Sequence, residues 1–410
     1  MKNIVILFDG TWNTADATHP SNVVKIGRLV LPRTADGVDQ VVFYHPGVGS
    51  GEVAVGKWLD TWLGGAFGVG LMENIAEAYR FLTFNYAPGD RIFIFGFSRG
   101  AFSARSFGGL LRTCGILKRE NVGKVREAIR LYQNRDDRPT VDADGKTVSP
   151  PDHDRYLVFR RDNSQALSNS SYERTWRAGA GRTAETPATT PTLSIEYMGV
   201  WDTVGALGIP SGFAFANTFN RRYRFHDLQL SRMVQSARQA LAIDERRRTF
   251  EATPWSNIDD LNTAVGAAEP MSPSLPYQQQ WFPGDHGTIG GCGDVNGLWE
   301  AAFAWVAEGA VQRGLGLDAA GLAAHWDNID LTASTSCMAR PAFSFANLSF
   351  KAWRRGPEKH EVHTVSEWAA RRVRLSPKDL GTRRAYRPRT LRHVLPKLLA
   401  EPSDGSADAS

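Results

Sequence analysis

The hydrophobic pattern of the first hundred or so residues alternates between short apolar runs and segments of helical period. Three runs, Ile4–Phe8, Gln40–Tyr44 and Arg91–Phe95, are of strand length and almost wholly apolar, which is typical of strands buried on both faces. Apolar residues recur every three or four positions over Leu71–Tyr86, and Ala101–Leu111 also predicts a helix. Buried strands joined by helices predict an α/β fold, with a mostly parallel central sheet and helices on both faces.

The same alternation resumes after residue 190. Ser194–Trp201 and Gln279–Phe282 predict two more strands, and Leu228–Ile243 and Leu298–Val311 predict two more helices. Residues 134–191 differ, because they are rich in Asp, Arg, Ser, Thr, Pro and Gly and show little periodicity. We expect them to form an excursion from the sheet that is either partly disordered or a lid.

Composition and charge exclude several classes of protein. Hydrophobic residues make up 42% of the 410 residues, enough for a sizeable core. The net charge of +5 is mild, so we expect no nucleic-acid partner. The basic clusters, including the last fifty residues, predict solvated faces or a transient contact with a membrane surface. Cys114, Cys292 and Cys337 have neither metal-ligand spacing nor a disulfide pattern, and we expect no cofactor and no metal.

No segment predicts a membrane span or a signal peptide. The chain enters the run IVILF directly, without an h-region or a cleavage site. The most apolar stretch, residues 58–72, is short and is interrupted by Asp60 and by glycines, so we expect no transmembrane segment. These features predict a cytoplasmic protein, or one exported without a classical signal peptide. The segment 57–72 predicts either ordinary core and loop or an apolar lid beside a pocket.

One serine stands in a distinctive context. The strand predicted at residues 91–95 runs directly into Gly96-Phe97-Ser98-Arg99-Gly100, and a helix follows. A serine on such a sharp strand-to-helix turn stands above the edge of the sheet, and small residues on either side let strand and helix approach closely. The start of the helix offers N–H groups and the positive end of its dipole to a developing oxyanion. This context predicts an α/β-hydrolase fold with Ser98 as the nucleophile.

A serine hydroxyl needs a base and a group that orients the base. On this fold the acid and then the histidine follow the serine, each at the end of a later strand. Asp202 directly follows one predicted strand, and His286 lies in a glycine-rich loop after the next. We therefore expect a triad of Ser98, His286 and Asp202, with Asp285 as the second choice for the acid. The remaining histidines either precede the acid or lack a preceding strand and tight loop: His19, His45, His153, His226, His325, His360, His363 and His393.

An oxyanion hole needs two donors. The first is expected to be the backbone N–H of Arg99, the residue after the nucleophile. The second is expected from Gly10 or Thr11, in the turn that follows the first predicted strand. Asp9 in the same turn is predicted to support the site, either by accepting hydrogen bonds from backbone N–H groups or by positioning a headgroup or a metal; Asp285 is a second supporting candidate.

Six blocks of the sequence carry a resemblance to a known family: FDGTWN, GDRIFIFGFSRGAFSAR, GVWDTVGALG, ALAIDERRRTF, WFPGDHGTIGG and VHTVSEWAAR. Together they span roughly residues 1–370 and resemble the α/β-hydrolase domain of the phospholipase effectors of type VI secretion systems. The resemblance implies that Ser98, Asp202 and His286 form the catalytic triad, and that effector members hydrolyse phospholipid acyl esters. The chain has little room for the large membrane-binding insertions expected of these toxins, which weakens the effector interpretation more than the hydrolase one.

The predicted function is a serine hydrolase that cleaves carboxylic esters, of lipids or phospholipids, through an acyl-enzyme. The alternatives are a small-ester esterase and a hydrolase fold used as a non-enzymatic binding module. An aspartate-nucleophile phosphatase is disfavoured because Leu7 occupies the place of the nucleophile. A metal-dependent esterase would need Asp9, Asp202 and Asp285 to converge.

These predictions imply three parts of the chain. We expect an α/β-hydrolase catalytic domain over residues 1–345, with residues 134–191 as its polar insertion or lid. A basic C-terminal region over residues 346–398 is expected to pack on this domain, and residues 399–410 are expected to form a disordered tail.

Overall fold

The fold is taken from a computed structural model of the 410-residue chain. The residues that the structure describes are 1–10, 13–47, 66–134, 140–141, 147–148, 153–165, 173–174, 176–177, 192–204, 229–247, 250–267, 272, 274–293, 295–336 and 364–400. Within these residues, no helix is both long enough and apolar enough to cross a bilayer.

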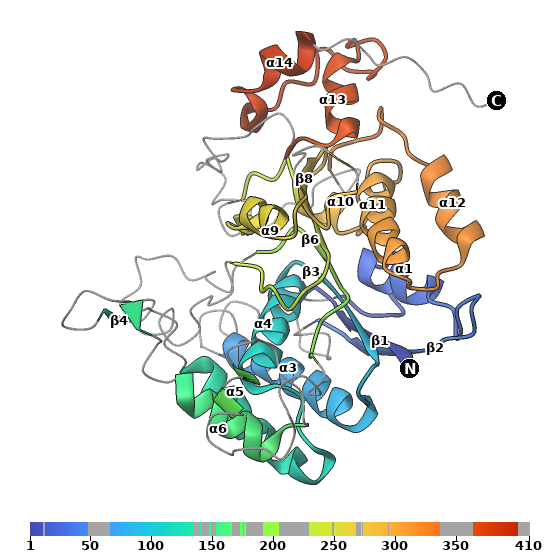
Figure 1. The fold of residues 1–410 in the computed structure, drawn as a ribbon. Helices are drawn as coiled ribbons and strands as arrows, with labels where there is room; N and C mark the ends of the chain where they lie inside the picture. Colours follow the sequence, from blue (N-terminus) through green and yellow to red (C-terminus); the bar gives the residue numbers. More distant parts are fainter. Residues whose placement is uncertain are drawn as a thin grey trace.

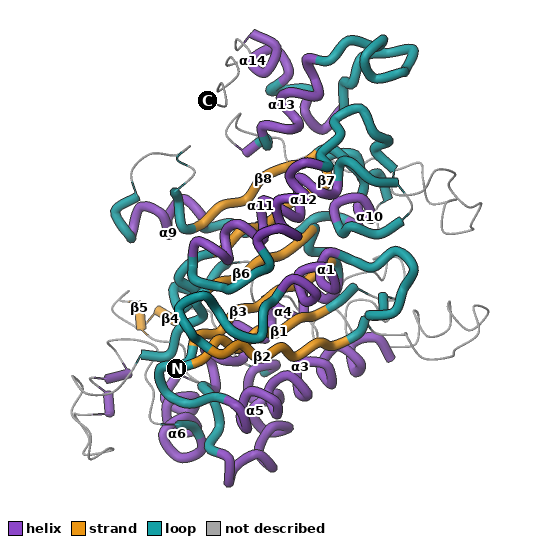
Figure 2. The backbone as a smooth tube through the Cα atoms, turned by 90° about the vertical axis from the view of Figure 1, so that its right-hand side faces the viewer, coloured by secondary structure: helices purple, strands orange, loops and turns teal. Residues whose placement is uncertain are grey.

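The centre of the fold is a six-stranded sheet in which every neighbouring pair of strands runs parallel, in the order β2-β1-β3-β6-β7-β8 (Figure 2). The direction of the strand order reverses between β1 and β3. In open parallel sheets, ligands bind beyond the carboxyl ends of strands at such a reversal. The strands are β1 (Lys2–Phe8), β2 (Asp39–His45), β3 (Arg91–Phe97), β6 (Tyr197–Trp201), β7 (Ala237–Ala242) and β8 (Tyr277–Phe282).

Helices cover both faces of this sheet, so the fold is α/β-hydrolase-like with three layers (Figure 1). Side chains alternate along β1: Ile4 and Ile6 join one apolar cluster, whereas Val5 and Leu7 join the other. The first cluster includes residues of α3 (Ala66–Asn85), α4 (Arg99–Cys114), α5 (Val125–Gln133), α6 (His153–Asn163) and α9 (Ile258–Ala264). The second includes residues of α1 (Asn22–Leu29), α11 (Trp299–Gln312) and α12 (Ala319–Asp327).

The prediction of a helix over Leu228–Ile243 is wrong. The structure has strand β7 at Ala237–Ala242, preceded by bends and turns from residue 229, whereas Leu228 lies outside the described residues. Alanine, leucine, arginine and glutamine favour a helix, but this segment lies between β6 and β8 with all six strand residues buried. Pairing with two neighbouring strands therefore overrides the local preference.

Part of the polar segment at residues 134–191 belongs to the core. Helix α6 (His153–Asn163) places Tyr156, Leu157 and Phe159 in buried positions, although the sequence shows little periodicity there. The short strands β4 (Thr140–Val141) and β5 (Thr147–Val148) form an antiparallel pair. Most of the remaining residues of 134–191 lie outside the described residues. So do residues 57–65 of the second candidate lid, 57–72. Both lid assignments therefore stay predictions.

The C-terminal segment, residues 364–400, packs on the last two strands of the sheet. It contains α13 (Glu367–Arg374), a 3-10 turn at Arg389–Leu391 and α14 (Leu395–Ala400). Its apolar side chains form a third cluster with Leu241 of β7, Trp281 of β8 and Ile243, which follows β7. The predicted domain boundaries stay a prediction, and residues 401–410 of the predicted tail lie outside the described residues. Two further short helices are a 3-10 helix at Arg119–Lys124 and α10 at His286–Ile289.

Candidate active site

Ser98 lies on the turn between β3 and α4 with a backbone φ of 59°, which non-glycine residues rarely adopt. The side chain is buried, with 4% of its surface exposed. The glycines on either side allow this turn. A Cβ on Gly96 would lie 2.6 Å from Gly100 O, and one on Gly100 would lie 2.1 Å from Phe8 O. The G-x-S-x-G pattern thus reflects close approach of β3, α4 and the end of β1.

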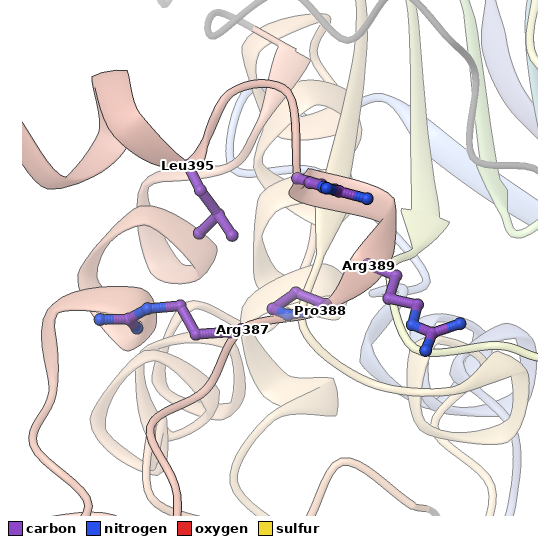
Figure 3. A pocket seen from close by; sticks show the side chains of 5 residues that line it. Arg387, Pro388, Arg389 and Leu395 are labelled. Atoms are coloured by element: carbon purple, nitrogen blue, oxygen red, sulfur yellow. The ribbon is translucent and has the colours of Figure 1, made fainter.

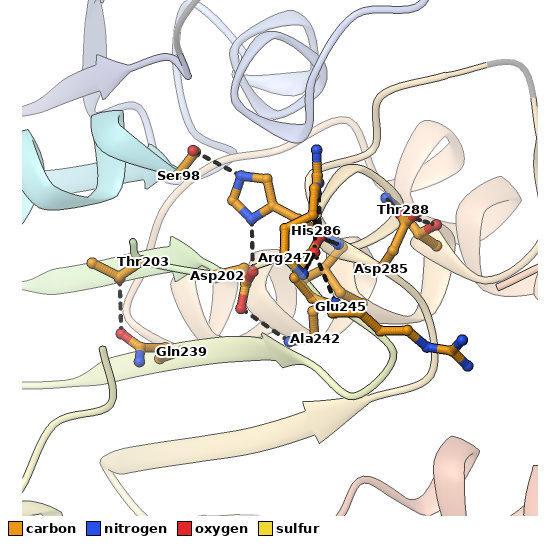
Figure 4. A network of polar contacts seen from close by, with 12 residues as sticks. Ser98, Asp202, Thr203, Gln239, Ala242, Glu245, Arg247, Asp285, His286 and Thr288 are labelled. Carbon is orange, nitrogen blue, oxygen red and sulfur yellow. Dashed lines mark hydrogen bonds and ion pairs between the residues drawn. The ribbon is translucent and has the colours of Figure 1, made fainter. Parts of the chain in front are cut away.

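A chain of hydrogen bonds joins three of the residues selected from the sequence (Figure 4). Ser98 Oγ lies 2.8 Å from His286 Nε2, and His286 Nδ1 lies 2.6 Å from Asp202 Oδ2. An ionised carboxylate only accepts, so the imidazole tautomer that fits carries its proton on Nδ1 and accepts the Ser98 hydroxyl proton at Nε2. The three residues are separated by up to 188 positions in the chain and come from the ends of β3, β6 and β8.

Asp202 follows β6 directly and is fully buried. Its backbone φ of 35° is the second positive value among non-glycine residues in the described part of the chain. The carboxylate is held at both oxygens: Oδ2 by His286 and Oδ1 by the backbone N–H of Ala242 at 3.1 Å. The Ala242 N–H therefore fixes the carboxylate plane relative to the sheet.

His286 is the first residue of α10, in the loop that follows β8. Its ring contacts two aromatic rings, with centroid distances of 4.8 Å to Phe97 and 4.7 Å to Phe250. Only 5% of the residue is exposed. These contacts limit rotation of the imidazole and help to shield it from water.

Asp285, the second choice for the acid, faces away from the imidazole nitrogens and caps α10. Its Oδ1 accepts hydrogen bonds from Thr288 N and Thr288 Oγ1, each at 2.9 Å. This is the ordinary role of an aspartate before a helix. The geometry favours Asp202 over Asp285 as the partner of His286.

Asp9 organises the turn after β1. Its carboxylate accepts from Gly10 N at 2.7 Å, Ser21 Oγ at 2.6 Å and Tyr44 Oη at 2.9 Å. Burial raises the pKa of the Asp9 carboxyl, and these hydrogen bonds oppose that rise. Of the two alternatives for Asp9, the contacts favour the one in which it holds the loop through backbone N–H groups.

The expected oxyanion donors differ in how well their positions suit that role. The N–H of Arg99 is the first amide of α4, next to Ser98. The N–H of Gly10 donates to Asp9 Oδ1 in this structure, and Thr11 lies outside the described residues. The oxyanion assignment therefore stays a prediction, with Arg99 the better placed of its described members.

Sequence reasoning missed a carboxylate next to the triad. Glu245, three residues beyond β7, accepts the backbone N–H of His286 at 3.2 Å and pairs with the Arg247 guanidinium at 2.7 Å. Burial raises the pKa of the Glu245 carboxyl, but the Arg247 hydrogen bonds and charge and the nearby His286 outweigh burial and lower it to about 2. A buried strand that runs directly into the charged sequence DERRR could have indicated this carboxylate. The prediction of a helix over Leu228–Ile243 prevented that strand from being recognised.

The described residues contain no cluster of three or more metal-binding side chains, so Asp9, Asp202 and Asp285 do not converge there. The other described histidines lie elsewhere: His45 pairs with Glu77, and His325 packs on Trp299 and Phe303. His19 and His393 are exposed. Within the described residues neither Cys114 nor Cys292 forms a disulfide, and the buried Cys114 thiol donates to Ala128 O at 3.3 Å; Cys337 lies outside the described residues.

Three comparisons relate the chain to known proteins. A family model described as T6SS (type VI secretion system), phospholipase effector Tle1-like, catalytic domain matches residues 2–309. The uncharacterized protein YEL023C of Saccharomyces cerevisiae is 28% identical over 272 residues, which cover 63% of this chain and 34% of that protein.

Two solved structures are also similar. One is an uncharacterized protein from Pseudomonas aeruginosa, with a TM-score of 0.37 and 16% identity over 77% of this chain and 46% of the other. The second is the Tle1 effector bound to the VgrG spike of the type VI secretion system, with a TM-score of 0.34 and 19% identity over 72% of this chain and 52% of the other. The chain spans about half or less of the length of each of these three proteins.

Proposed function

Because the chain belongs to the family of Tle1-like phospholipase effector catalytic domains of type VI secretion, we propose that it is a serine hydrolase that cleaves carboxylic esters of phospholipids. The observation that carries the proposal is the hydrogen-bonded chain from Ser98 through His286 to Asp202. A hydroxyl, an imidazole and a buried carboxylate in this order constitute the machinery of acyl transfer.

In the proposed mechanism, Ser98 Oγ attacks the ester carbonyl while its proton passes to His286 Nε2. Asp202 holds the Nδ1 proton and stabilises the imidazolium that forms. The imidazolium then gives its proton to the leaving alcohol, which departs and leaves an acyl group on Ser98. Water attacks this acyl-enzyme with His286 as the base, which releases the fatty acid and restores the serine.

The tetrahedral intermediate needs donors for its oxyanion. We assign one to the Arg99 N–H at the start of α4, where the helix dipole also favours negative charge. The second is assigned to the turn after β1, which Asp9 holds against α1 through Ser21. Gly100, whose Cα approaches Phe8 and Asp9 backbone oxygens, brings this turn close to Ser98.

The test compares wild type, Ser98→Ala and Ser103→Ala on a p-nitrophenyl ester series and on a labelled phospholipid vesicle. Ser103 is a matched control, because it is a buried serine of α4 whose hydroxyl donates to the backbone oxygen of Arg99, at 3.3 Å. We expect Ser98→Ala alone to lose activity and labelling by a fluorophosphonate. Preference for short acyl chains would replace the phospholipid assignment by a small-ester esterase, and an unlabelled, inactive wild type would indicate a binding module.

The C-terminal segment also supports a contact with an anionic lipid surface. Residues 364–400 contain ten arginines and lysines against two acidic residues, Glu367 and Asp379. Arg387, Pro388, Arg389, Arg392 and Leu395 line a cleft of about 600 Å³, with Arg387 and Arg389 on either side of Pro388 (Figure 3). Exposed arginines beside a half-buried leucine suit phosphate headgroups and the start of their acyl chains.

This contact is tested by sedimentation with phosphatidylglycerol and phosphatidylcholine vesicles, using Ser98→Ala protein so that no lipid is consumed. Reversal of Arg387, Arg389 and Arg392 to Glu should weaken binding to the anionic vesicles by about a hundredfold or more, at roughly 1 kcal/mol for each basic side chain near the surface. Reversal of three exposed arginines near α5, Arg119, Arg126 and Arg130, is the matched control. If both variants lost vesicle binding equally, the cleft would not be the site of lipid contact.

A further inference from the structure

Two adjacent acidic residues after β7 hold the loop that carries His286. This loop, residues 283–286, is called the histidine loop below. Asp244 Oδ2 accepts the Gly284 N–H at 2.8 Å, and Glu245 Oε2 accepts the His286 N–H at 3.2 Å. The Asp244 N–H in turn donates to Gly284 O at 3.0 Å. Two side chains thus bind alternate backbone amides of one short loop.

Each carboxylate also accepts hydrogen bonds from outside the histidine loop. Glu245 Oε1 accepts from the backbone N–H groups of Arg246 and Arg247 at 2.8 and 2.6 Å, and the Arg247 guanidinium pairs with Glu245 Oε2 at 2.7 Å. Asp244 Oδ2 accepts from the hydroxyl of Tyr386, at 2.7 Å. Tyr386 belongs to the C-terminal segment, more than a hundred residues away in the chain.

We propose that Asp244 and Glu245 are positioning residues that set the place of the His286 imidazole, and that Tyr386 makes the C-terminal segment part of this device. The catalytic consequence rests on the proposed function, in which His286 is the base. A base must lie within hydrogen-bond reach of the proton that it takes, and a misplacement of about 1 Å can cost about a hundredfold in rate.

The geometry of the loop makes it dependent on these contacts. Gly284 has a φ of 132°, a conformation that other residues rarely adopt, so the loop is not held by ordinary backbone preference. Arg247 adds a second contact, because its guanidinium lies 3.8 Å from the Phe250 ring centroid and that ring packs on the His286 imidazole. The ion pair between Glu245 and Arg247 therefore acts on both the backbone and the ring of His286.

The C-terminal segment is anchored at several points around Tyr386. Ser366 N donates to Trp281 O at 3.0 Å in β8, and Thr390 Oγ1 donates to Ile243 O at 3.1 Å at the end of β7. The Arg372 guanidinium lies 4.9 Å from the Tyr386 ring centroid. Strand β7 leads into Asp244, and β8 leads into the histidine loop. The C-terminal segment therefore contacts both strands that position the site.

The experiment uses full-length Tyr386→Phe and Glu245→Gln, with Tyr277→Phe and Glu300→Gln as matched controls. Tyr277 donates its hydroxyl to Val234 O at 2.7 Å at the amino end of β8, and the buried Glu300 accepts the Gly297 N–H at 2.7 Å. We expect the two test variants to lower kcat by about ten- to a hundredfold with little change in KM, and the controls to keep the wild-type kcat. Asp244→Asn, which keeps an acceptor for Gly284, should be milder than Asp244→Ala.

A His286→Ala background separates positioning from general damage to the fold. A residue that acts through His286 should have no further effect on the residual ester hydrolysis once the imidazole is gone. If Tyr386→Phe lowered the residual rate further in the His286→Ala background, the proposal would be overturned. It would also be overturned if both test variants, with His286 intact, kept the wild-type kcat.

A spectroscopic arm keeps this test independent of the proposed function. The Nδ1 proton that His286 shares with Asp202 should give a downfield proton NMR resonance that His286→Ala removes. We expect Tyr386→Phe and Glu245→Gln to shift or broaden this resonance, and Tyr277→Phe and Glu300→Gln to leave it unchanged. An unchanged resonance in the test variants would refute positioning, even if the wild type hydrolysed no ester at all.

Discussion

Replacement of Asp202 by asparagine should separate the role of its charge from the role of its shape. The side chain is fully buried, and its two oxygens accept from Ala242 N at 3.1 Å and His286 Nδ1 at 2.6 Å. An asparagine can still accept the Ala242 N–H through its amide oxygen, which then leaves its NH₂ group facing His286 Nδ1. Two donors cannot share this contact, so the imidazole is expected to adopt the tautomer with its proton on Nε2.

That tautomer removes the acceptor for the Ser98 hydroxyl, which lies 2.8 Å from Nε2. The same substitution in a Ser-His-Asp triad of this geometry lowers kcat by about 10⁴, which is about 5.5 kcal/mol of transition-state free energy. The amide has nearly the volume of the carboxylate, so we expect the loss in kcat to far exceed any loss of fold.

The assay is hydrolysis of a p-nitrophenyl ester together with the rate of fluorophosphonate labelling of Ser98, at matched thermal stability. Asp285→Asn is the control, because Asp285 caps α10 through Thr288 and does not contact the imidazole nitrogens. Asparagine caps a helix about as well as aspartate does, so this variant should keep nearly the wild-type stability, with kcat within a few-fold of wild type. Wild-type kcat in Asp202→Asn, or a 10⁴-fold loss in Asp285→Asn instead, would refute the assignment of Asp202.

Two further substitutions test the fold around the site. Gly100→Ala should lower the free energy of unfolding by about 3 kcal/mol or more, because its Cβ would lie 2.1 Å from Phe8 O and 2.4 Å from Asp9 O. Gly123→Ala is the control and should be near neutral, because its Cβ would meet nothing within 4 Å. Urea denaturation measures both changes. Glu245 has a pKa lowered from 4.5 to about 2, so its stabilising contribution is present above pH 4.5 and disappears as the pH falls toward 2. Between these values the unfolding free energy of wild type should fall by on the order of 3 kcal/mol more than that of Glu245→Gln, and parallel curves for the two proteins would contradict this.

The central strands and the turn around Ser98 were accessible from local sequence. Apolar runs of strand length at residues 4–8 and 91–95 lie within β1 and β3, because a strand buried on both faces has no polar positions to obscure it. Ser98 could be selected because a buried strand, a tight turn and a helix follow one another within about twenty residues. Asp202 and His286 could be selected because the order of residues along the chain mirrors the order of strand ends in this fold.

Other parts of the site depend on contacts that local sequence does not encode. The segment at Ala237–Ala242 has the composition of a helix, and only its place between β6 and β8 makes it a strand. Since that strand was not predicted, the position of Asp244 and Glu245 at its carboxyl end was not predicted either. Nothing in the sequence around Tyr386 indicates that its hydroxyl lies 2.7 Å from Asp244.

The sequence by itself determined the class of fold and the three residues that we propose for acyl transfer, because hydrophobic period and strand-to-turn transitions are properties of short segments. Tertiary structure supplied the contacts that separate the two acidic candidates: the Asp202 carboxylate meets His286 Nδ1, whereas the Asp285 carboxylate caps α10. It also decided that Asp244, Glu245 and Tyr386 surround the histidine loop. Such contacts join residues far apart in the chain, and their geometry exists only once the sheet has brought the strand ends together.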